Sequence, residues 1–425
     1  MKKILSIVLV LVMTSTIMVG CGGKGSGTTD ESNNLKVGVV LIGDKNDTYT
    51  KAHLDGIKSA AKEVGINPKN ILVRDNIKEN TCAKMAKDLI GNGCSLIISN
   101  SYAHQDAINK VAKDNSDVDF VAMSGDYAAV SGNGNMHDAF TLAYEARYVS
   151  GVVAGMKIKE LVDKKKIPSK DLDKEENVKV GYVGAYPNAE IVSGYTAFYL
   201  GIKSVYKKVA MKVLYTNSWF NTKKEETAAK ELIKDNCLII GMHTDSKQVP
   251  SVIQKAKDNG TKVYSVGYNA SMLGVAKNAA LTSSINNWEV YYKELFQIAL
   301  DNDDIPRDWA KGYPDKAVSI SKLGPEVAKG TEEKVKEVEK GLADGSIKVF
   351  DTSKFTVNGK RIESHMVDLS KFDYSKNPPT VLFKGEEKEA IETQDEISYF
   401  SESTLRSAPY FDLRIDGIKE LNAKK

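Results

Sequence analysis

The chain has 425 residues, of which 42% are hydrophobic and 27% are charged, and this composition is typical of a folded protein. At this length we expect two or three domains with a sizeable core, which excludes a peptide or a small disulfide scaffold. There are 59 basic and 56 acidic residues, so the formal charge is only +3. An evenly mixed, near-neutral chain is a poor nucleic-acid binder, and we expect no nucleic-acid partner.

The N-terminus has the pattern of a secretory signal. Lys2 and Lys3 precede an apolar stretch at 4–13, and a small-residue junction follows at Gly20-Cys21. The apolar run is shorter than the roughly 20 residues of a membrane-spanning helix. No other segment approaches that length, which excludes a channel or permease. We predict a signal peptide over 1–20 and a flexible, glycine-rich tether over 21–35.

The junction before Cys21 resembles a bacterial lipobox. That resemblance implies a diacylglyceryl group on the Cys21 thiol, which would anchor the mature protein to the extracytoplasmic face of the cell membrane. The alternative is an ordinary signal peptide with an incidental cysteine.

Three further cysteines, Cys82, Cys94 and Cys237, remain in the mature chain. An odd number cannot all pair internally, and none belongs to a close-spaced metal quartet, so we expect no metal and no cofactor. We interpret them as buried thiols. A Cys82–Cys94 disulfide stays open as an alternative, because an extracytoplasmic compartment permits it.

Residues 36–266 alternate between short apolar, β-branched runs and helical patterns. The first set has predicted strands at 36–42, 70–74, 95–99 and 118–123, with helices beginning near 51 and covering 80–91 and 105–113. A long predicted helix, 142–159, carries Gly151 and Gly155 at a spacing that allows close packing. The second set has strands at 178–183, 211–215, 238–241 and 262–266, with helices at 191–206, 222–234 and 248–259.

Parallel strands need such crossover helices, so the pattern predicts an α/β fold with two doubly wound parallel-sheet lobes joined by a hinge. We expect the first lobe to comprise 36–145 and 283–325, and the second lobe 146–282. A C-terminal extension, 326–425, is expected to pack partly on the lobes. It contains a charged helix at 331–343 and a hairpin signal at Asn358-Gly359, and no chemistry is assigned to it.

In open α/β sheets, ligands bind beyond the carboxyl ends of the strands. The loops at these ends are rich in polar and aromatic residues, without a concentrated charge. A cleft lined in this way suits a flat, uncharged, heteroatom-rich ligand such as a purine or pyrimidine. The alternative is that each ring is a half-buried packing residue. The candidate ligand-binding residues are Asp47, Thr48, Tyr49, Ser101, Tyr102, Ser124, Tyr186, Trp219, His243, Asp245, Tyr268, Asn269, Asn287 and Trp288.

Several motifs together resemble the basic membrane protein family, the purine-nucleoside-type substrate-binding lipoproteins of ATP-binding-cassette (ABC) transporters, over about residues 36–325. They are Lys36-Val37-Gly38-Val39-Val40 with Asp47-Thr48-Tyr49, Tyr144-Glu145-Ala146-Arg147-Tyr148, Lys179-Val180-Gly181-Tyr182-Val183-Gly184 and Ser218-Trp219. Two further motifs, His243-Thr244-Asp245-Ser246 and Asn287-Trp288 with Tyr291-Tyr292, resemble a branch associated with purine bases as well as nucleosides. The resemblance implies the type I periplasmic-binding-protein fold, a purine-like ligand, and ABC permease and ATPase partners.

Carried over by position, the ring-stacking aromatic of the family falls on Trp219, and its first-loop contacts fall on 47–50. Ser124 stands where nucleoside binders carry an acid that grips the purine edge. Asn269 stands where the family has its ribose-binding acid. A carboxylate binds two hydroxyls more strongly than an amide does, so a free base becomes an alternative to a nucleoside.

Two other function classes compete with a transport receptor. One is a ligand-sensing surface lipoprotein of the same fold. The other is an extracytoplasmic hydrolase using His243, Asp245 and Ser246, but adjacent residues in one short loop rarely give the geometry of a catalytic triad. We therefore predict a binding protein, not an enzyme, that delivers a purine base or nucleoside to an ABC permease.

Overall fold

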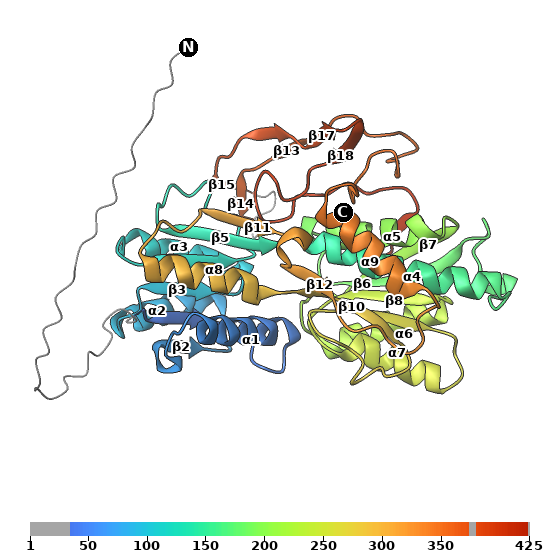
Figure 1. The fold of residues 1–425 in the computed structure, drawn as a ribbon, viewed down its shortest axis with the longest axis horizontal. Coiled ribbons are helices and arrows are strands. Elements are labelled where there is room, and N and C mark those ends of the chain that lie inside the picture. Colours follow the sequence, from blue (N-terminus) through green and yellow to red (C-terminus); the bar gives the residue numbers. More distant parts are fainter. Residues whose placement is uncertain (1–34, 374–379, 424–425) are drawn as a thin grey trace, which may run out of the picture.

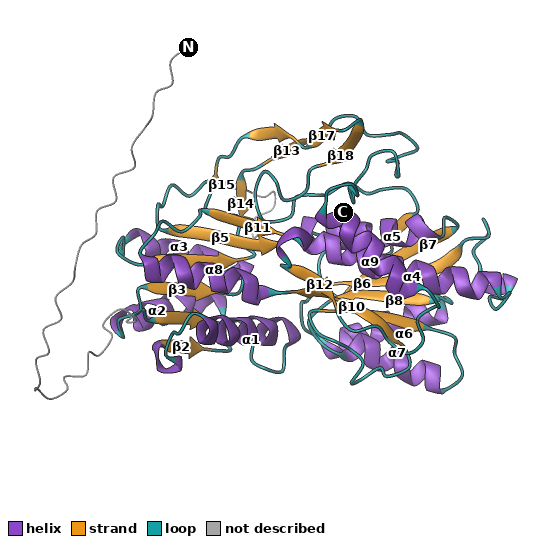
Figure 2. Cartoon of the chain, in the orientation of Figure 1, coloured by secondary structure: helices purple, strands orange, loops and turns teal. Residues whose placement is uncertain are grey.

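The computed structural model describes residues 35–373 and 380–423. Two sheets form the cores of two lobes that lie end to end, and helices cover both faces of each sheet (Figure 1; Figure 2). Each lobe therefore has two apolar layers, one on either side of its sheet.

The first lobe is built on six parallel strands in the order β11-β5-β4-β3-β1-β2. The strands are β1 (Val37–Val40), β2 (Ile71–Arg74), β3 (Leu96–Ser99), β4 (Asp119–Met123), β5 (Met136–Thr141) and β11 (Asp308–Lys311), and the helices are α1 (Thr48–Glu63), α2 (Glu79–Gly91), α3 (Gln105–Lys113) and α8 (Trp288–Asp301). Every residue of β1 and β3 is buried, as expected for central strands with helices on both faces.

The second lobe is built on seven strands in the order β12-β10-β9-β8-β6-β7-β19, of which β12 alone runs antiparallel to its neighbour. The strands are β6 (Val178–Gly184), β7 (Val209–Tyr215), β8 (Ile239–His243), β9 (Tyr264–Tyr268), β10 (Ala280–Asn286), β12 (Val318–Ile320) and β19 (Ile418–Glu420), and the helices are α4 (Ala143–Asp163), α5 (Ala189–Val205), α6 (Thr222–Lys234) and α7 (Gln248–Asp258). Four short 3₁₀ turns, η2 (Pro68–Asn70), η3 (Tyr102–His104), η4 (Ser169–Asp171) and η5 (Tyr313–Asp315), join these elements.

Helices α4 and α5 pack closely because glycines remove the side chains between them. A Cβ atom on Gly151 would lie 2.1 Å from the carbonyl oxygen of Phe198, and one on Gly201 would lie 2.1 Å from that of Tyr148. At Gly155 the corresponding distance to the carbonyl oxygen of Ile202 is 2.8 Å. The close packing predicted from Gly151 and Gly155 is confirmed, and it fixes the long helix against the second sheet.

Residues 283–325 do not all belong to the lobe that we predicted for them. We expected 283–325 in the first lobe, but β10 and β12 belong to the second sheet, where Ser284 pairs with Ile320. Only α8 and β11 return to the first lobe. The chain therefore crosses between the lobes three times, after β5, after β10 and after β11.

The C-terminal extension packs on both lobes, as Figure 1 shows for the orange-to-red end of the chain. Its elements are α9 (Thr331–Ala343) and the strand pairs β13 (Met366–Asp368) with β16 (Glu387–Glu389), β14 (Lys371–Asp373) with β15 (Thr380–Phe383), and β17 (Ile391–Gln394) with β18 (Ile397–Phe400). Phe350, Phe400 and Phe411 join the core of the second lobe, and β19 pairs with β7 of its sheet. In the predicted turn, Asn358 and Gly359 have φ values of 52° and 77° between paired Val357 and Lys360, as a type I′ turn requires.

The three cysteines after residue 35 are buried and unpaired, as predicted for buried thiols, and the alternative Cys82–Cys94 disulfide is not formed. The predicted signal peptide, Cys21 and the tether up to residue 34 lie outside the described residues. Within the described ranges, none of the helices has the length and hydrophobicity that crossing a membrane requires.

Candidate functional site

A cavity of about 670 Å³ lies between the lobes at the carboxyl ends of their strands. This is the edge of the sheets at which the sequence predicts a ligand site. The lining residues are Ile42, Gly43, Asp44, Asn46, Asp47, Tyr49, Asn76, Asn100, Ser101, Tyr102, Ala103, Ser124, Tyr186, Glu190, Ser218, Trp219, Phe220, Asp245 and Tyr268. Nine of the fourteen candidate residues are among them: Asp47, Tyr49, Ser101, Tyr102, Ser124, Tyr186, Trp219, Asp245 and Tyr268.

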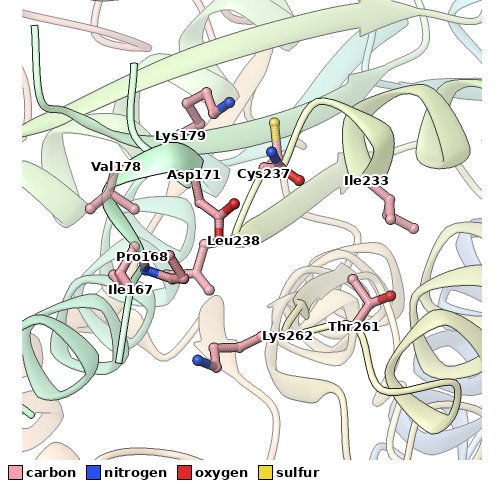
Figure 3. Close-up of a pocket in the computed structure, with 11 residues that line it drawn as sticks. Ile167, Pro168, Asp171, Val178, Lys179, Ile233, Cys237, Leu238, Thr261 and Lys262 are labelled. Atoms are coloured by element: carbon pink, nitrogen blue, oxygen red, sulfur yellow. The ribbon is translucent and has the colours of Figure 1, made fainter. Parts of the chain in front are cut away.

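A second hollow, at the opposite ends of the strands of the second lobe, is far smaller. It has a volume of about 90 Å³ and lies beside Val178 at the start of β6 and Leu238 before β8 (Figure 3). Small-molecule sites usually measure roughly 300 to 1,000 Å³. The interlobe cavity has that size, and the hollow in Figure 3 does not.

The wall contributed by the first lobe is held by hydrogen bonds among its loops. The hydroxyl of Tyr49 donates to the carbonyl oxygen of Asn100 at 2.7 Å and lies 3.0 Å from Oγ of Ser124. Ser124 has a φ of 64°, so the strained end of β4 directs its side chain toward Tyr49. These contacts bring together the ends of β3 and β4 and the first turn of α1, which is why residues 75 positions apart share one wall.

Asp47 caps helix α1 and also faces the cavity. Its carboxylate accepts hydrogen bonds from the backbone N–H groups of Tyr49 and Thr50, at 2.8 and 3.3 Å, and from the Thr50 hydroxyl at 3.1 Å. Burial raises the pKa of Asp47, although these hydrogen bonds oppose the shift. Asp47 thus has a structural role, because it fixes the first turn of α1, which carries Tyr49.

Aromatic rings form the wall contributed by the second lobe. The Trp219 ring lies 5.9 Å from that of Tyr186 and 6.1 Å from that of His243, in edge-to-face arrangements. The ring of His243 in turn lies 4.6 Å from that of Tyr268. Trp219 is half-buried, so one side packs on protein while it also lines the cavity. This arrangement leaves an aromatic surface on which a flat ligand can stack.

Five candidate residues do not line the cavity. Thr48, His243 and Asn269 are buried directly behind the wall, at the ends of α1, β8 and β9. Trp288 is 1% exposed in the core of the first lobe, where its ring stacks on His53 at 4.5 Å. Asn287 binds the carbonyl oxygen of Lys316 at 2.7 Å and the hydroxyl of Ser319 at 3.1 Å. The strand-end position of Asn287-Trp288 is as expected, but both side chains turn away from the cavity.

The sequence analysis missed Glu190. This residue lies in the first turn of α5, just after the loop at the carboxyl end of β6, and its side chain is 21% exposed toward the cavity. The signal that identifies it is an acid in the first helical turn next to a predicted ligand loop. Its carboxyl oxygen lies 3.3 Å from Nε2 of His243, and burial raises its pKa to about 7 against the opposing effect of Arg147.

The expected absence of concentrated charge is wrong for this cavity. Four acidic residues, Asp44, Asp47, Glu190 and Asp245, line it. Burial, with help from Asp47 and Glu190, raises the pKa of Asp245 well above its usual range. Arg147 is buried behind them, with its guanidinium 3.9 Å from the centre of the Tyr268 ring. The acids come from separate loops and a helix, which is why no charge run in the sequence reveals them.

His243 cannot supply positive charge to this cluster. It is 1% exposed, and burial together with the nearby Arg147 lowers its pKa well below the usual range, so the ring is neutral. Its Nδ1 atom faces the hydroxyl of Tyr182 at 3.5 Å. Its ring contacts Trp219 and Tyr268, and its Nε2 lies near Glu190, so His243 fixes the positions of the aromatic wall and the acid relative to each other.

Comparison with known proteins identifies a family. The family described as Bmp, ABC transporter substrate-binding protein PnrA-like, matches residues 34–352. A purine-binding protein of Brucella abortus is 29% identical over 345 residues, which cover 79% of this chain and 91% of that protein. The ABC transporter nucleoside-binding protein BmpA of Lactococcus lactis is 20% identical over 382 residues, covering 84% of this chain and 99% of that protein.

Solved structures agree on the fold. An ABC transporter solute-binding protein from Aeropyrum pernix superimposes with a TM-score of 0.60 at 14% identity, over 74% of this chain and 93% of that one. One from Conexibacter woesei has a TM-score of 0.58 at 17% identity, over 74% and 98%. The predicted α/β fold of the type I periplasmic-binding-protein class is confirmed.

Proposed function

The chain belongs to the Bmp family of ABC transporter substrate-binding proteins, and on that premise we propose that it captures a purine base or nucleoside in the interlobe cavity and delivers it to an ABC permease. The observation that carries the proposal is a cavity of about 670 Å³ between the lobes, lined by Trp219, Tyr186 and Tyr268. Its volume suits one nucleoside-sized ligand. The printed name of the Brucella abortus relative points to the same ligand class.

In this proposal the ligand ring stacks on Trp219, and the polar loops of the first lobe read its edges. Base stacking on one aromatic side chain contributes about 1 to 3 kcal/mol. Tyr49 donates its hydroxyl proton to Asn100 and accepts from Ser124, so the lone pairs that remain on the two oxygens can accept hydrogen bonds from the ligand without breaking either bond. Closure of the two lobes around the ligand then gives the permease a form that differs from the empty one.

The proposal includes anchoring through Cys21 at the extracytoplasmic face of the cell membrane. A lipid on this cysteine would hold the lobes near the permease, with residues 22–35 as the tether. Cys21→Ser should abolish incorporation of labelled fatty acid and release or misprocess the protein, while Cys237→Ser, at a buried thiol of the second lobe, should leave incorporation intact. A Cys21→Ser protein that is still lipidated would exclude this anchor.

The direct test of function is the identity of the bound ligand. The mature protein is purified without added ligand, denatured, and the released small molecules are identified by mass spectrometry. We expect a purine base or nucleoside, and calorimetry with that compound should give a one-to-one complex. A protein that carries none and binds none of adenine, guanosine, inosine or hypoxanthine in calorimetry contradicts the proposal.

A further inference from the structure

The lining of the cavity has a one-sided charge. Its nineteen residues include four acids, and none of the nineteen is Lys, Arg or His. A phosphate or carboxylate on a ligand would meet no cationic side chain there and would face several carboxyl groups. The cavity therefore favours a ligand that offers N–H donors and carries no negative charge.

The four acids are not equally available to a ligand. Asp47 is engaged in capping α1, and Asp44 accepts from the backbone N–H of Asn46 at 2.7 Å. Asp245 accepts from the side-chain amide of Asn269, at 3.4 Å. Among the described residues, by contrast, no hydrogen bond ends on the Glu190 carboxyl, whose nearest polar partner is Nε2 of His243 at 3.3 Å. Glu190 is the lining acid with the most unused acceptor capacity.

The surroundings of Glu190 keep this carboxyl in place beside the stacking surface. His243 contacts both Glu190 and Trp219, so the acid stands next to the ring on which we propose the ligand stacks. Arg147 is close enough for its charge to act on Glu190, and its Nη1 donates to the carbonyl oxygen of Met242 at 2.6 Å. Among the described residues, Arg147 donates no hydrogen bond to the Glu190 carboxyl, so it supplies positive charge without occupying the acceptor oxygens.

We propose that Glu190, with Asp245 beside it, accepts hydrogen bonds from the N–H groups along one edge of the ligand. The cavity then selects an amino-bearing nitrogen heterocycle and rejects its phosphorylated derivatives. This inference rests on the proposed function, because it names the chemical group within the purine class that the site reads. A carboxylate accepting from two adjacent N–H groups gives charge-assisted bonds that a neutral acceptor cannot match.

The proposal has a pH signature. A carboxyl whose pKa is raised to about 7 is partly protonated at neutral pH, and it must lose that proton before it accepts two N–H bonds. Affinity for an amino-bearing ligand should therefore rise with pH through about 7 and fall below it. The charged and titratable groups around Glu190 are Arg147 of α4, Tyr182 of β6, His243 of β8, Asp245 after β8, Tyr268 of β9 and Tyr49 of α1.

Apart from Asp245, the neighbours do not produce this pH dependence. His243 has a lowered pKa and the tyrosines have raised pKa values, so neither kind titrates near pH 7. Asp245 also has a raised pKa, and its titration is part of the proposed pair. Substitution of Glu190 alone should therefore change the pH profile.

Calorimetry with matched ligand pairs tests the proposal. Adenine and unsubstituted purine differ by one exocyclic amine, and so do guanosine and inosine. In the wild-type protein the amino member of at least one pair should bind about tenfold more tightly, which is about 1.4 kcal/mol. Adenosine 5′-monophosphate should bind about a hundredfold more weakly than adenosine. Glu190→Gln should remove most of the amine preference and flatten the pH dependence between pH 6 and 8.

The control is Glu289→Gln, which makes the same change on the exposed surface of α8, where Glu289 accepts from the Ser59 hydroxyl. It should bind like wild type, and thermal melts should show that both variants are folded. Equal binding of both members of both pairs, with no effect of Glu190→Gln, overturns the role of Glu190 while purine binding stands. Failure of every base and nucleoside to bind wild type instead overturns the proposed function.

Discussion

Thr48 and Asp245 connect the two lobes directly. The backbone N–H of Thr48 and its hydroxyl both donate to the carbonyl oxygen of Asp245, at 3.2 and 2.8 Å. Thr48 begins α1 in the first lobe, whereas Asp245 follows β8 in the second, and both residues are buried. The same loop presents the Asp245 carboxyl to the cavity, so the lobe contact and the proposed ligand contact share one segment.

Thr48→Val should weaken this interlobe contact without changing its shape. The valine keeps the N–H bond and loses the hydroxyl bond, which contributes about 0.5 to 1.5 kcal/mol net. We expect the ligand to dissociate roughly two- to tenfold faster, because opening of the lobes breaks one bond fewer. Stopped-flow tryptophan fluorescence measures this rate.

Thr81→Val is the control, since the Thr81 hydroxyl donates to the carbonyl oxygen of Lys78 on the exposed start of α2. Equal rates in both variants would mean that Thr48 does not resist opening.

Trp219→Ala should weaken binding of a purine by roughly tenfold or more. The substitution removes the ring that packs beside Tyr186 on the cavity wall, and with it the proposed stacking surface. Titration of wild type should also quench tryptophan fluorescence, because the other two tryptophans, Trp288 and Trp309, lie in the core of the first lobe.

Trp219→Phe serves as the matched variant. It keeps an aromatic face, so it should retain most of the affinity while the ligand-dependent quenching disappears. An affinity for Trp219→Ala that equals wild type would make Trp219 a packing residue.

Lys371→Met should loosen the C-terminal extension from the first lobe. Lys371 of β14 is 3% exposed and pairs with Asp126 at 2.8 Å, and its Nζ lies 4.0 Å from the centre of the Tyr102 ring at the cavity. Asp126, whose side chain is 11% exposed, loses its ion pair at 2.8 Å and keeps the longer one to Arg406 at 4.0 Å, so we expect a cost below the roughly 3 to 5 kcal/mol of a buried charge left without a partner. We expect a lower unfolding midpoint in urea and faster cleavage of the extension in limited proteolysis.

Lys384→Met is the control for this change. Lys384 is 70% exposed and reaches Asp368 only at 4.0 Å, so its loss should change the free energy of unfolding by less than about 1 kcal/mol. Similar proteolysis of the two variants would show that the pair at Lys371 does not secure the extension.

Local sequence patterns predicted most of the fold, because the spacing of apolar residues within a segment distinguishes a helix from a strand. The helices expected at 105–113, 222–234 and 331–343 are α3, α6 and α9 with the same bounds. Strands β5 and β11 were not predicted, since the buried His137 and Asp138 interrupt the apolar run of β5, and the four residues of β11 begin and end with the charged Asp308 and Lys311. The pairing of β19 with β7 joins segments about two hundred residues apart in sequence, and no local pattern contains that information.

The site was predictable as a set of loops but not as a set of side-chain directions. Tyr49, Trp219 and Tyr268 line the cavity because they stand at or soon after the carboxyl ends of parallel strands. Trp288 follows β10 in the same way, yet its ring enters the core against His53. Glu190 was missed because Tyr186 was the only candidate chosen between the strand and the helix of this unit, and the burial that raises the pKa of Glu190 is created only by the fold.

Asn269→Asp tests the position that the family resemblance assigns to ribose binding. Asn269 does not line the cavity. Its amide donates to the Asp245 carboxyl at 3.4 Å and its oxygen accepts from Asn286 at 3.0 Å. The substitution replaces the donor by an oxygen, so two carboxyl groups would face each other in a buried place. We therefore expect no gain in nucleoside affinity and a loss of stability of about 2 to 4 kcal/mol at pH 8.

The sign of the pH dependence follows from proton binding. Burial and neighbouring acids already raise the pKa of Asp245, and a second carboxyl raises the pKa of the pair further, so the folded variant binds more protons than the unfolded chain. The loss of stability should thus be small near pH 5 and should grow as the pH rises through the raised pKa. Urea unfolding of wild type and variant at pH 5 and pH 8 measures the difference.

Asn236→Asp is the matched control, because Asn236 has a similar left-handed φ of 60° but is exposed. The close carboxyl pair would be contradicted if the loss of stability in Asn269→Asp were the same at both pH values, or no larger than in Asn236→Asp. A rise in nucleoside affinity in Asn269→Asp would mean that position 269 contacts the ligand.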